Sequence, residues 1–242
     1  ETGLSPIDVL KKKTWTQWKS VSTNQPPPDD HDLNEGRKAL IRLATRSDPE
    51  FLSAVEDVAN AVNVQETVEK YGSSMGTALH YTMWGQKAAK VGVSNIQESS
   101  EKWSSNQSIA RDAKEIVIWR KRIQPYPLRE IKLPFSCFLK LHAAYDIREI
   151  NAALRQNSLK TPGQTGVGVL HNSELKVYAH LVTFRKVEKD FTPTTLYKDY
   201  PISLVQLHWE SQSTATQSTP TGQNYIHFKK RGYTILFFAR LE

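Results

Sequence analysis

The chain has almost no cysteine, and this scarcity excludes two classes of protein. Its 242 residues contain a single cysteine, Cys137. An internal disulfide framework and a zinc site built from several thiolates are therefore impossible. Cys137 lies in the apolar run 133–139, and no basic residue adjoins it to favour a thiolate. We expect a buried structural thiol rather than a nucleophile.

Long apolar runs and nucleotide-binding loops are also missing. No apolar stretch approaches the roughly 18 residues of a membrane-spanning helix, and we recognise no signal peptide. The chain has no Gly-x-x-x-x-Gly-Lys-Ser/Thr loop, no His-Glu-x-x-His helix and no Gly-x-Ser-x-Gly elbow. We therefore expect a cytoplasmic chain with no membrane partner, cofactor, metal or catalytic activity. It begins at Glu1 rather than Met and ends in Leu241-Glu242, so we expect an excised fragment.

Two partial catalytic patterns leave a DNA hydrolase as a weaker alternative. Glu-Leu-Lys at 174–176 matches half of a metal-dependent nuclease motif, and Asp146 would be its upstream carboxylate. On a strand, His208 and Glu210 would share a face and act as base and orienter, and His227 is another partner for His208. Neither pattern supplies a complete set of catalytic residues, so we expect a fragment without catalytic activity.

Positive charge is in excess, and it is unevenly placed. The formal net charge is +7. Residues 1–150 carry 21 Lys/Arg and 19 Asp/Glu, whereas residues 151–242 carry 11 and 6. The net charge of the second part is therefore +5, against +2 for the first. Such an excess favours an anionic partner, and we expect DNA.

The first part of the chain has helical periodicity. Residues 1–35 are expected to form a helix and a proline-rich linker. Two apolar stripes then flank Ser-Asp-Pro-Glu at 47–50, which is typical of a helix start with proline in its first turn. Further helices are predicted at 108–122 and at 146–154, the latter with a capping box between Asp146 and Glu149.

After residue 160 the apolar period changes to two, which predicts strands. The predicted strands are residues 175–184, 205–209, 225–228 and 233–240. The polar segment 211–222 is expected to be a mobile loop. We therefore predict an α+β fold, in which a helical layer over residues 1–155 precedes a small, mostly antiparallel β-barrel or bent sheet over residues 156–242.

The last third of the chain carries an ordered series of motifs. They are Val182-Thr183, Thr192-Pro193-Thr194-Thr195, Tyr-Lys-Asp-Tyr-Pro-Ile-Ser at 197–203, Leu-His-Trp-Glu-Ser-Gln-Ser at 207–213, Thr-Gly-Gln-Asn-Tyr-Ile-His at 221–227 and Leu-Phe-Phe-Ala-Arg at 236–240. This series resembles the uncharacterised C-terminal domain family of bacterial superfamily II (DEAD/DEAH-type) helicases of restriction and phage-defence systems. Those proteins often carry a phospholipase-D-like nuclease domain. A weaker likeness begins near residue 35.

The resemblance implies a setting and a role. The parent protein would be an ATP-dependent helicase and nuclease whose helicase core lies elsewhere in the same chain. This fragment would be its DNA-binding target-recognition module, reading a modified base or a modified backbone, and it would be associated with the nucleoid. The alternative is a protein-interaction module that docks the helicase onto a partner through Trp15, Trp18 and the N-terminal helices.

The residues expected to bind DNA fall into basic, polar and aromatic groups. They are Arg185, Lys186, Thr194, Thr195, Tyr197, Tyr200, His208, Ser211, Gln212, Ser213, Gln223, Tyr225, His227, Lys229, Lys230 and Arg231. Basic side chains would contact phosphates, although lysines also protect a solvated strand edge. Hydroxyl and amide groups would read base edges. His208 and Gln212 are expected on one strand face.

Aromatic side chains are expected to form a pocket for an extruded base. Its walls would be Tyr197, Tyr200, Trp209 and Tyr225. For Trp209, packing in the core beside Val205 and Leu207 is the favoured alternative, because the three share one face of the predicted strand.

Overall fold

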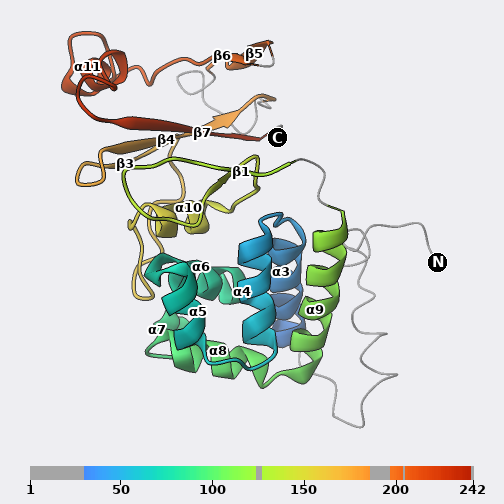
Figure 1. Ribbon diagram of the computed structural model, residues 1–242. Coiled ribbons are helices and arrows are strands. Elements are labelled where there is room, and N and C mark those ends of the chain that lie inside the picture. The colour runs from blue at the N-terminus through green and yellow to red at the C-terminus, as the bar shows by residue number, and fades with distance from the viewer. Residues whose placement is uncertain (1–29, 124–126, 186–196, 204, 241–242) are drawn as a thin grey trace. The chain divides into compact units, whose positions relative to one another are not determined.

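The computed structural model describes residues 30–123, 127–185, 197–203 and 205–240, in two compact units over residues 1–165 and 166–242 (Figure 1). The described chain is α+β, as predicted, with helices in the first unit and small sheets. The expected helix with Trp15 and Trp18 lies outside the described residues. Within them, no helix combines the length and apolarity needed to cross a bilayer.

Helices fill the first unit. They are α3 (Asp30–Ala44), α4 (Pro49–Ala59), α5 (Val64–Tyr71), α6 (Ser73–Trp84), α7 (Ala88–Val91), α8 (Ile96–Ser104), α9 (Gln107–Arg122) and α10 (Ile147–Ala153). A short pair of strands, β1 (Arg129–Glu130) and β2 (Lys140–Leu141), accompanies them. Helix α6 packs against α3, α5, α8 and α10 and is buried along most of its length, so it forms the centre of this unit.

The start of α4 confirms the predicted cap. Asp48 Oδ1 accepts hydrogen bonds from the backbone N–H groups of Glu50, at 2.9 Å, and Phe51. Pro49 occupies the first helical position, where its missing N–H costs nothing. Phe51 and the apolar residues that follow it along one stripe are buried. Cys137, by contrast, is only half-buried, and burial raises the pKa of its thiol.

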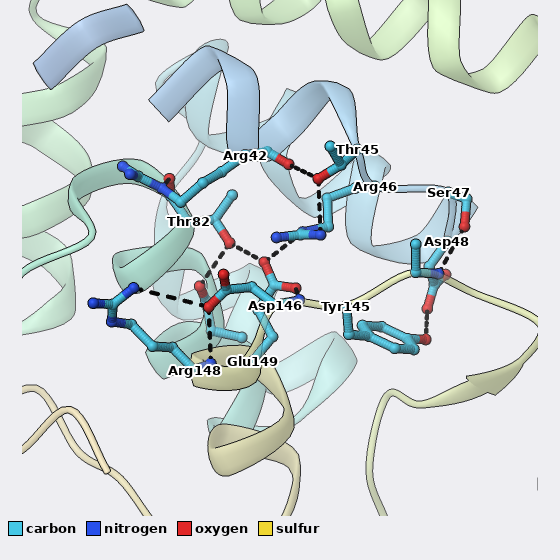
Figure 2. Close-up of polar contacts among 12 residues, drawn as sticks. Arg42, Thr45, Arg46, Ser47, Asp48, Thr82, Tyr145, Asp146, Arg148 and Glu149 are labelled. Carbon is cyan, nitrogen blue, oxygen red and sulfur yellow. Dashed lines mark hydrogen bonds and ion pairs between the residues drawn. The ribbon is translucent and has the colours of Figure 1, made fainter. Parts of the chain in front are cut away.

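A buried ion pair joins α10 to the turn between α3 and α4 (Figure 2). Arg46 Nε donates to Glu149 Oε1 at 2.7 Å, and the two side chains are 5% and 1% exposed. The Thr82 hydroxyl of α6 donates to the same carboxylate oxygen. Glu149 Oε2 accepts the backbone N–H of Asp146 at 2.8 Å, which completes the predicted capping box. One carboxylate therefore connects three helical segments.

A second set of contacts fixes the same turn from the other side. The Tyr145 hydroxyl donates to Asp48 Oδ2 at 3.0 Å, while the other oxygen of that carboxylate caps α4 (Figure 2). The backbone N–H of Ala144 donates to Ser47 Oγ at 3.0 Å. The segment just before α10 is thus held by Asp48, which caps α4, and by its neighbour Ser47.

The second unit is built on a three-stranded sheet in the order β3-β4-β7. Strands β3 (Val169–Asn172) and β4 (Val177–Thr183) are antiparallel, whereas β4 and β7 (Thr234–Arg240) are parallel over seven residues. Strands β5 (Tyr200–Ser203) and β6 (Gln206–His208) form a separate antiparallel pair. The described strands close into no barrel, so that part of the prediction is wrong. A bent sheet is compatible with them.

Helix α11 (Pro220–Ile226) replaces the strand predicted at 225–228, and it begins inside the predicted loop. Thr219 caps it by accepting the Gly222 N–H at 3.1 Å, and Pro220 takes the first helical position. Gly222 is required here, because a Cβ at this residue would lie 1.8 Å from the Thr216 carbonyl oxygen. The alternation of apolar residues near Tyr225 therefore predicted a strand where the chain forms a helix.

The buried ion pair generates the first prediction. Glu149→Gln keeps the shape of the side chain but leaves the Arg46 guanidinium buried without a counter-charge. We expect the free energy of unfolding, measured by urea denaturation, to fall by about 3–5 kcal/mol. Adding Arg46→Met to Glu149→Gln should recover at least half of that loss, because the uncompensated charge is then gone. A loss below about 1 kcal/mol in the single variant would contradict this role.

Candidate nucleic-acid interface

One face of the β3-β4-β7 sheet collects aromatic and imidazole rings. Alternate residues of a strand share a face, so Tyr178 and His180 of β4 lie on the same side. The parallel register places Phe237 beside His180, and the antiparallel register places His171 beside Tyr178. The rings of His171 and Tyr178 are stacked, with centroids 4.1 Å apart and planes 5° apart.

Helix α11 is attached to this face by a chain of hydrogen bonds. Asn224 Nδ2 donates to the Tyr178 hydroxyl at 2.9 Å, and Asn224 Oδ1 accepts from Arg231 at 2.6 Å. The Tyr225 ring meets the Tyr178 ring edge to face, with centroids 5.0 Å apart. Arg231 therefore helps to position α11 as well as carrying positive charge at the surface.

The His180 ring belongs to this face and is completely buried by the rings around it. It is surrounded by the rings of Trp209 at 4.1 Å, Tyr225 at 5.0 Å, Phe237 at 5.1 Å and Tyr178 at 6.3 Å between centroids. Neither ring nitrogen of His180 has a hydrogen-bond partner among the described residues. Burial lowers the pKa of His180 to about 4, so the ring is neutral at pH 7.

Sequence reasoning missed His180, although a signal was present. The predicted strand at 175–184 is apolar on both faces around it, and a histidine inside such a strand is a buried polar group that needs a partner. Of the four predicted pocket walls, Trp209 and Tyr225 do come together, with ring centroids 5.4 Å apart. Tyr200 stacks on His208 instead.

A second aromatic feature is exposed on the β5–β6 hairpin. The rings of Tyr200 and His208 are stacked, with centroids 4.6 Å apart and planes 11° apart, and Tyr200 is 49% exposed. His208 Nδ1 is bonded to the Lys198 carbonyl oxygen at 2.9 Å, which fixes the imidazole. The stack therefore stands in solvent in a defined orientation.

Carboxylates near the hairpin are occupied by backbone groups. Glu210 accepts the Lys198 N–H at 3.1 Å, and Asp199 accepts the Glu210 N–H at 3.0 Å. The described contacts give no hydrogen bond between Glu210 and His208. Within the described residues, no group of three or more His, Cys, Asp or Glu side chains is placed to hold a metal ion.

The expected shared face of His208 and Gln212 is wrong. Strand β6 ends at His208, because the Glu210 N–H bonds to the Asp199 side chain and the chain then turns. The Gln212 carbonyl oxygen accepts the Ala215 N–H at 2.7 Å within that turn. Val205 is 90% exposed, so the predicted core face is wrong at that residue. Trp209, by contrast, packs against the buried His180 ring, as the alternative of core packing predicted.

The remaining polar candidates lie in local turns. Ser211 Oγ donates to the Ala215 carbonyl oxygen at 3.2 Å, and Gln223 Nε2 donates to the Gln217 carbonyl oxygen at 2.6 Å. The Ser213 N–H donates to the Tyr197 hydroxyl at 3.4 Å. These hydrogen bonds shape the segment that leads into α11, so these side chains have a structural use.

The basic candidates that the structure describes are exposed. Lys229, Lys230 and Arg231 follow α11 in the turn before β7, and Arg185 follows β4. His227 is exposed at the C-cap of α11. The other expected residues, Lys186, Thr194 and Thr195, lie outside the described residues.

Comparison with known proteins gives one result for this region. Residues 139–242 match the model of a family described as "Domain of unknown function (DUF3427)". The match covers somewhat less than half of the chain and contains α10, its capping box and every described element of the second unit. No curated protein and no solved structure matches the chain.

The buried imidazole generates a prediction about pH. The pKa of His180 is about 4 in the folded chain and near 6.5 when unfolded, so between about pH 6.5 and about pH 4 mainly the unfolded state takes up the proton. Stability is therefore full above about pH 6.5 and falls as the pH approaches 4. Between about pH 7.5 and about pH 5 we expect a loss of about 2 kcal/mol through this residue.

Hydrogen exchange of the β4 amides, corrected for intrinsic exchange rates, measures this loss as an opening free energy. His180→Phe should lack this component while keeping the smaller contributions of other histidines. Equal pH dependence in the two proteins would show that His180 is protonated as readily in the folded state as in the unfolded one.

Proposed function

We propose that the second unit is a DNA-binding module that recognises a target for a larger protein. The observation that carries the proposal is the exposed stack of Tyr200 on His208. A half-exposed aromatic ring held in one orientation is a platform for a nucleobase, and such stacking contributes about 1–3 kcal/mol per base. The neighbouring hydrogen bond from His208 to the Lys198 carbonyl keeps the platform ready before DNA arrives.

The charges of the same unit support an anionic partner. Its described basic residues are Lys176, Arg185, Lys198, Lys229, Lys230, Arg231 and Arg240, and its described acidic residues are Glu174, Asp199 and Glu210. Two of these three carboxylates accept local backbone N–H groups. The basic excess is suited to phosphates, which supply affinity that depends on salt but not on sequence.

The setting of this module rests on the resemblance of its motif series to helicase C-terminal domains. On that basis the partner within the parent chain is a helicase core, the system is one of restriction or phage defence, and the module reads a modified base or backbone. It would act in the cytoplasm, on nucleoid DNA. We propose that it binds without cleaving, since cleavage would belong to another domain.

A docking module for a partner protein is the second candidate. The exposed apolar residues Ile202, 59% exposed, and Val205, 90% exposed, on the β5–β6 hairpin favour it. Apolar docking would bind a protein with little dependence on salt, whereas phosphate contacts lose affinity steeply as salt rises. Salt dependence therefore separates the two candidates.

Lys229→Gln with Lys230→Gln tests the phosphate contacts. We expect weaker binding to every duplex and a reduction of about 2 in the slope of log affinity against log salt, measured by fluorescence anisotropy. Arg231 stays unchanged, because it positions Asn224. The matched control replaces Lys87 and Lys90, exposed in the first unit, with glutamine and should leave the slope unchanged. Equal effects of the two pairs would contradict a specific interface.

Tyr200 tests the stacking platform. Tyr200→Ala should lower affinity for single-stranded or locally opened DNA by about 1–3 kcal/mol, whereas Tyr200→Phe should retain most of it, since stacking needs the ring. A panel of plain, methylated, hydroxymethylated and phosphorothioated duplexes would show which target is preferred. If Ile202→Ala weakens DNA binding more than Tyr200→Ala does, the platform is not the contact.

A further inference from the structure

The burial of the His180 ring nitrogens costs free energy that no hydrogen bond within the described chain offsets. It is the only described side chain with two buried polar atoms that lack a hydrogen-bond partner. A buried donor or acceptor left without a partner costs about 1–3 kcal/mol, and such groups are rare in folded proteins. An apolar ring at this position would pack without that cost, so the imidazole calls for a functional explanation.

A second buried histidine in the same chain shows what a purely structural imidazole looks like. His80 of α6 is also fully buried. Its Nδ1 is bonded to Ser99 Oγ at 2.7 Å and its Nε2 to the Gln86 carbonyl oxygen at 2.8 Å. Both nitrogens of His80 are thus satisfied within the protein, whereas both nitrogens of His180 are left for a partner from outside the described chain.

The surroundings of His180 define the shape of that partner. The side chains around it present ring faces and edges, from Tyr178, Trp209, Tyr225 and Phe237. A group that enters among these rings is best accommodated if it is flat and aromatic, because offset and edge-to-face contacts then replace those that it displaces. A neutral imidazole offers one donor and one acceptor, so the group must carry polar atoms at its edge.

Only a thin layer of side chains covers His180, and two of these side chains belong to short elements or lie next to one. Phe237 is 48% exposed, so His180 lies about one side-chain layer below the surface. Trp209 and Tyr225 are half-buried, the first just after the three-residue strand β6 and the second in the last turn of the seven-residue helix α11. Movement of these two side chains would open His180 without disturbing the β4–β7 pairing.

We propose that Trp209 and Tyr225 move aside to admit an extruded nucleobase, which stacks among the rings and hydrogen-bonds through its polar edge to His180. This inference rests on the proposed DNA-binding function and deepens it by naming the group that is read. A base within a duplex cannot reach a side chain beneath the surface, so the base must leave the stack. Its stacking and its bond to His180 offset the cost of extrusion.

Duplexes with one weakened position test the proposal in the full chain. A single mismatch makes its base easy to extrude, and an abasic site at the same position removes the base. The wild-type chain should bind the mismatched duplex about tenfold more tightly than either the fully paired or the abasic duplex. His180→Phe should lose that preference while its affinity for the paired duplex stays unchanged, because that affinity depends on charge.

A stability measurement on the same variant shows that it folds and separates the outcomes. His180→Phe should be at least as stable as the wild type at neutral pH, since it removes two unpartnered polar atoms. If the variant is more stable and keeps the mismatch preference, His180 is only a tolerated buried group and the proposal is wrong. If the wild type binds all three duplexes equally, DNA binding stands but base extrusion is wrong.

Nitrogen NMR of His180 in the wild-type chain provides a readout that needs no variant. Titration with free nucleosides should shift at least one ring nitrogen of His180 and leave both nitrogens of His80 unchanged. A chain that binds no DNA and shows no such shift would overturn both the proposed function and this inference. A nucleoside shift without duplex binding would support the pocket and contradict the proposed DNA-binding role.

Discussion

The parallel pairing of β4 with β7 is the constraint on which the second unit depends. Parallel neighbours cannot be joined by a tight turn, so the chain after Thr183 must make a long connection before it returns at Thr234. That connection carries the β5–β6 hairpin, Trp209, α11 and the basic turn at 229–231. Every described element of the candidate interface other than the sheet itself and Arg185 therefore belongs to one crossover. The seven-residue register places Phe237 beside His180 on the sheet face that meets Trp209 and Tyr225.

Three fully buried titratable side chains differ in how far the fold supplies them with hydrogen-bond partners. In the first unit, Glu149 is surrounded by Arg46, Thr82 and the α10 capping N–H, and His80 has a partner at each nitrogen. Burial still raises the pKa of Glu149, which Arg46 opposes. Such satisfied networks hold helices in one arrangement. In the second unit His180 has no such partners, which is the pattern expected where a fold gives up stability for a site.

Local signals in the sequence predicted local structure well. The caps at Asp48 and Asp146 were predictable because a capping residue and the N–H group that it accepts lie within three positions of each other. Strands β4 and β7 were predictable as short runs rich in apolar and aromatic residues, although β4 is buried on both faces rather than alternating. Helix α11 was missed because its seven residues are too few to show a helical period, although Thr219-Pro220 is a helix-start signal.

The pairing of strands and the burial of side chains could not be predicted from the sequence, for physical reasons. The apolar residues of β4 do not specify which strand lies beside it or which way that neighbour runs, so a barrel and a crossover sheet were both consistent with them. The end of β6 at His208 depends on the Asp199 side chain eleven residues away from the N–H group of Glu210. The isolation of His180 appears only when rings from β4, β7, α11 and the segment after β6 are brought together.

Mapping of backbone amide NMR shifts during titration of the full chain with a short DNA duplex tests the central claim most directly. The account predicts that the shifts concentrate on the β5–β6 hairpin, the segment around Trp209, α11 and the turn at 229–231. The first unit should change little. Shifts confined to the first unit, or no shifts at all at low salt, would contradict a DNA-binding role for the second unit.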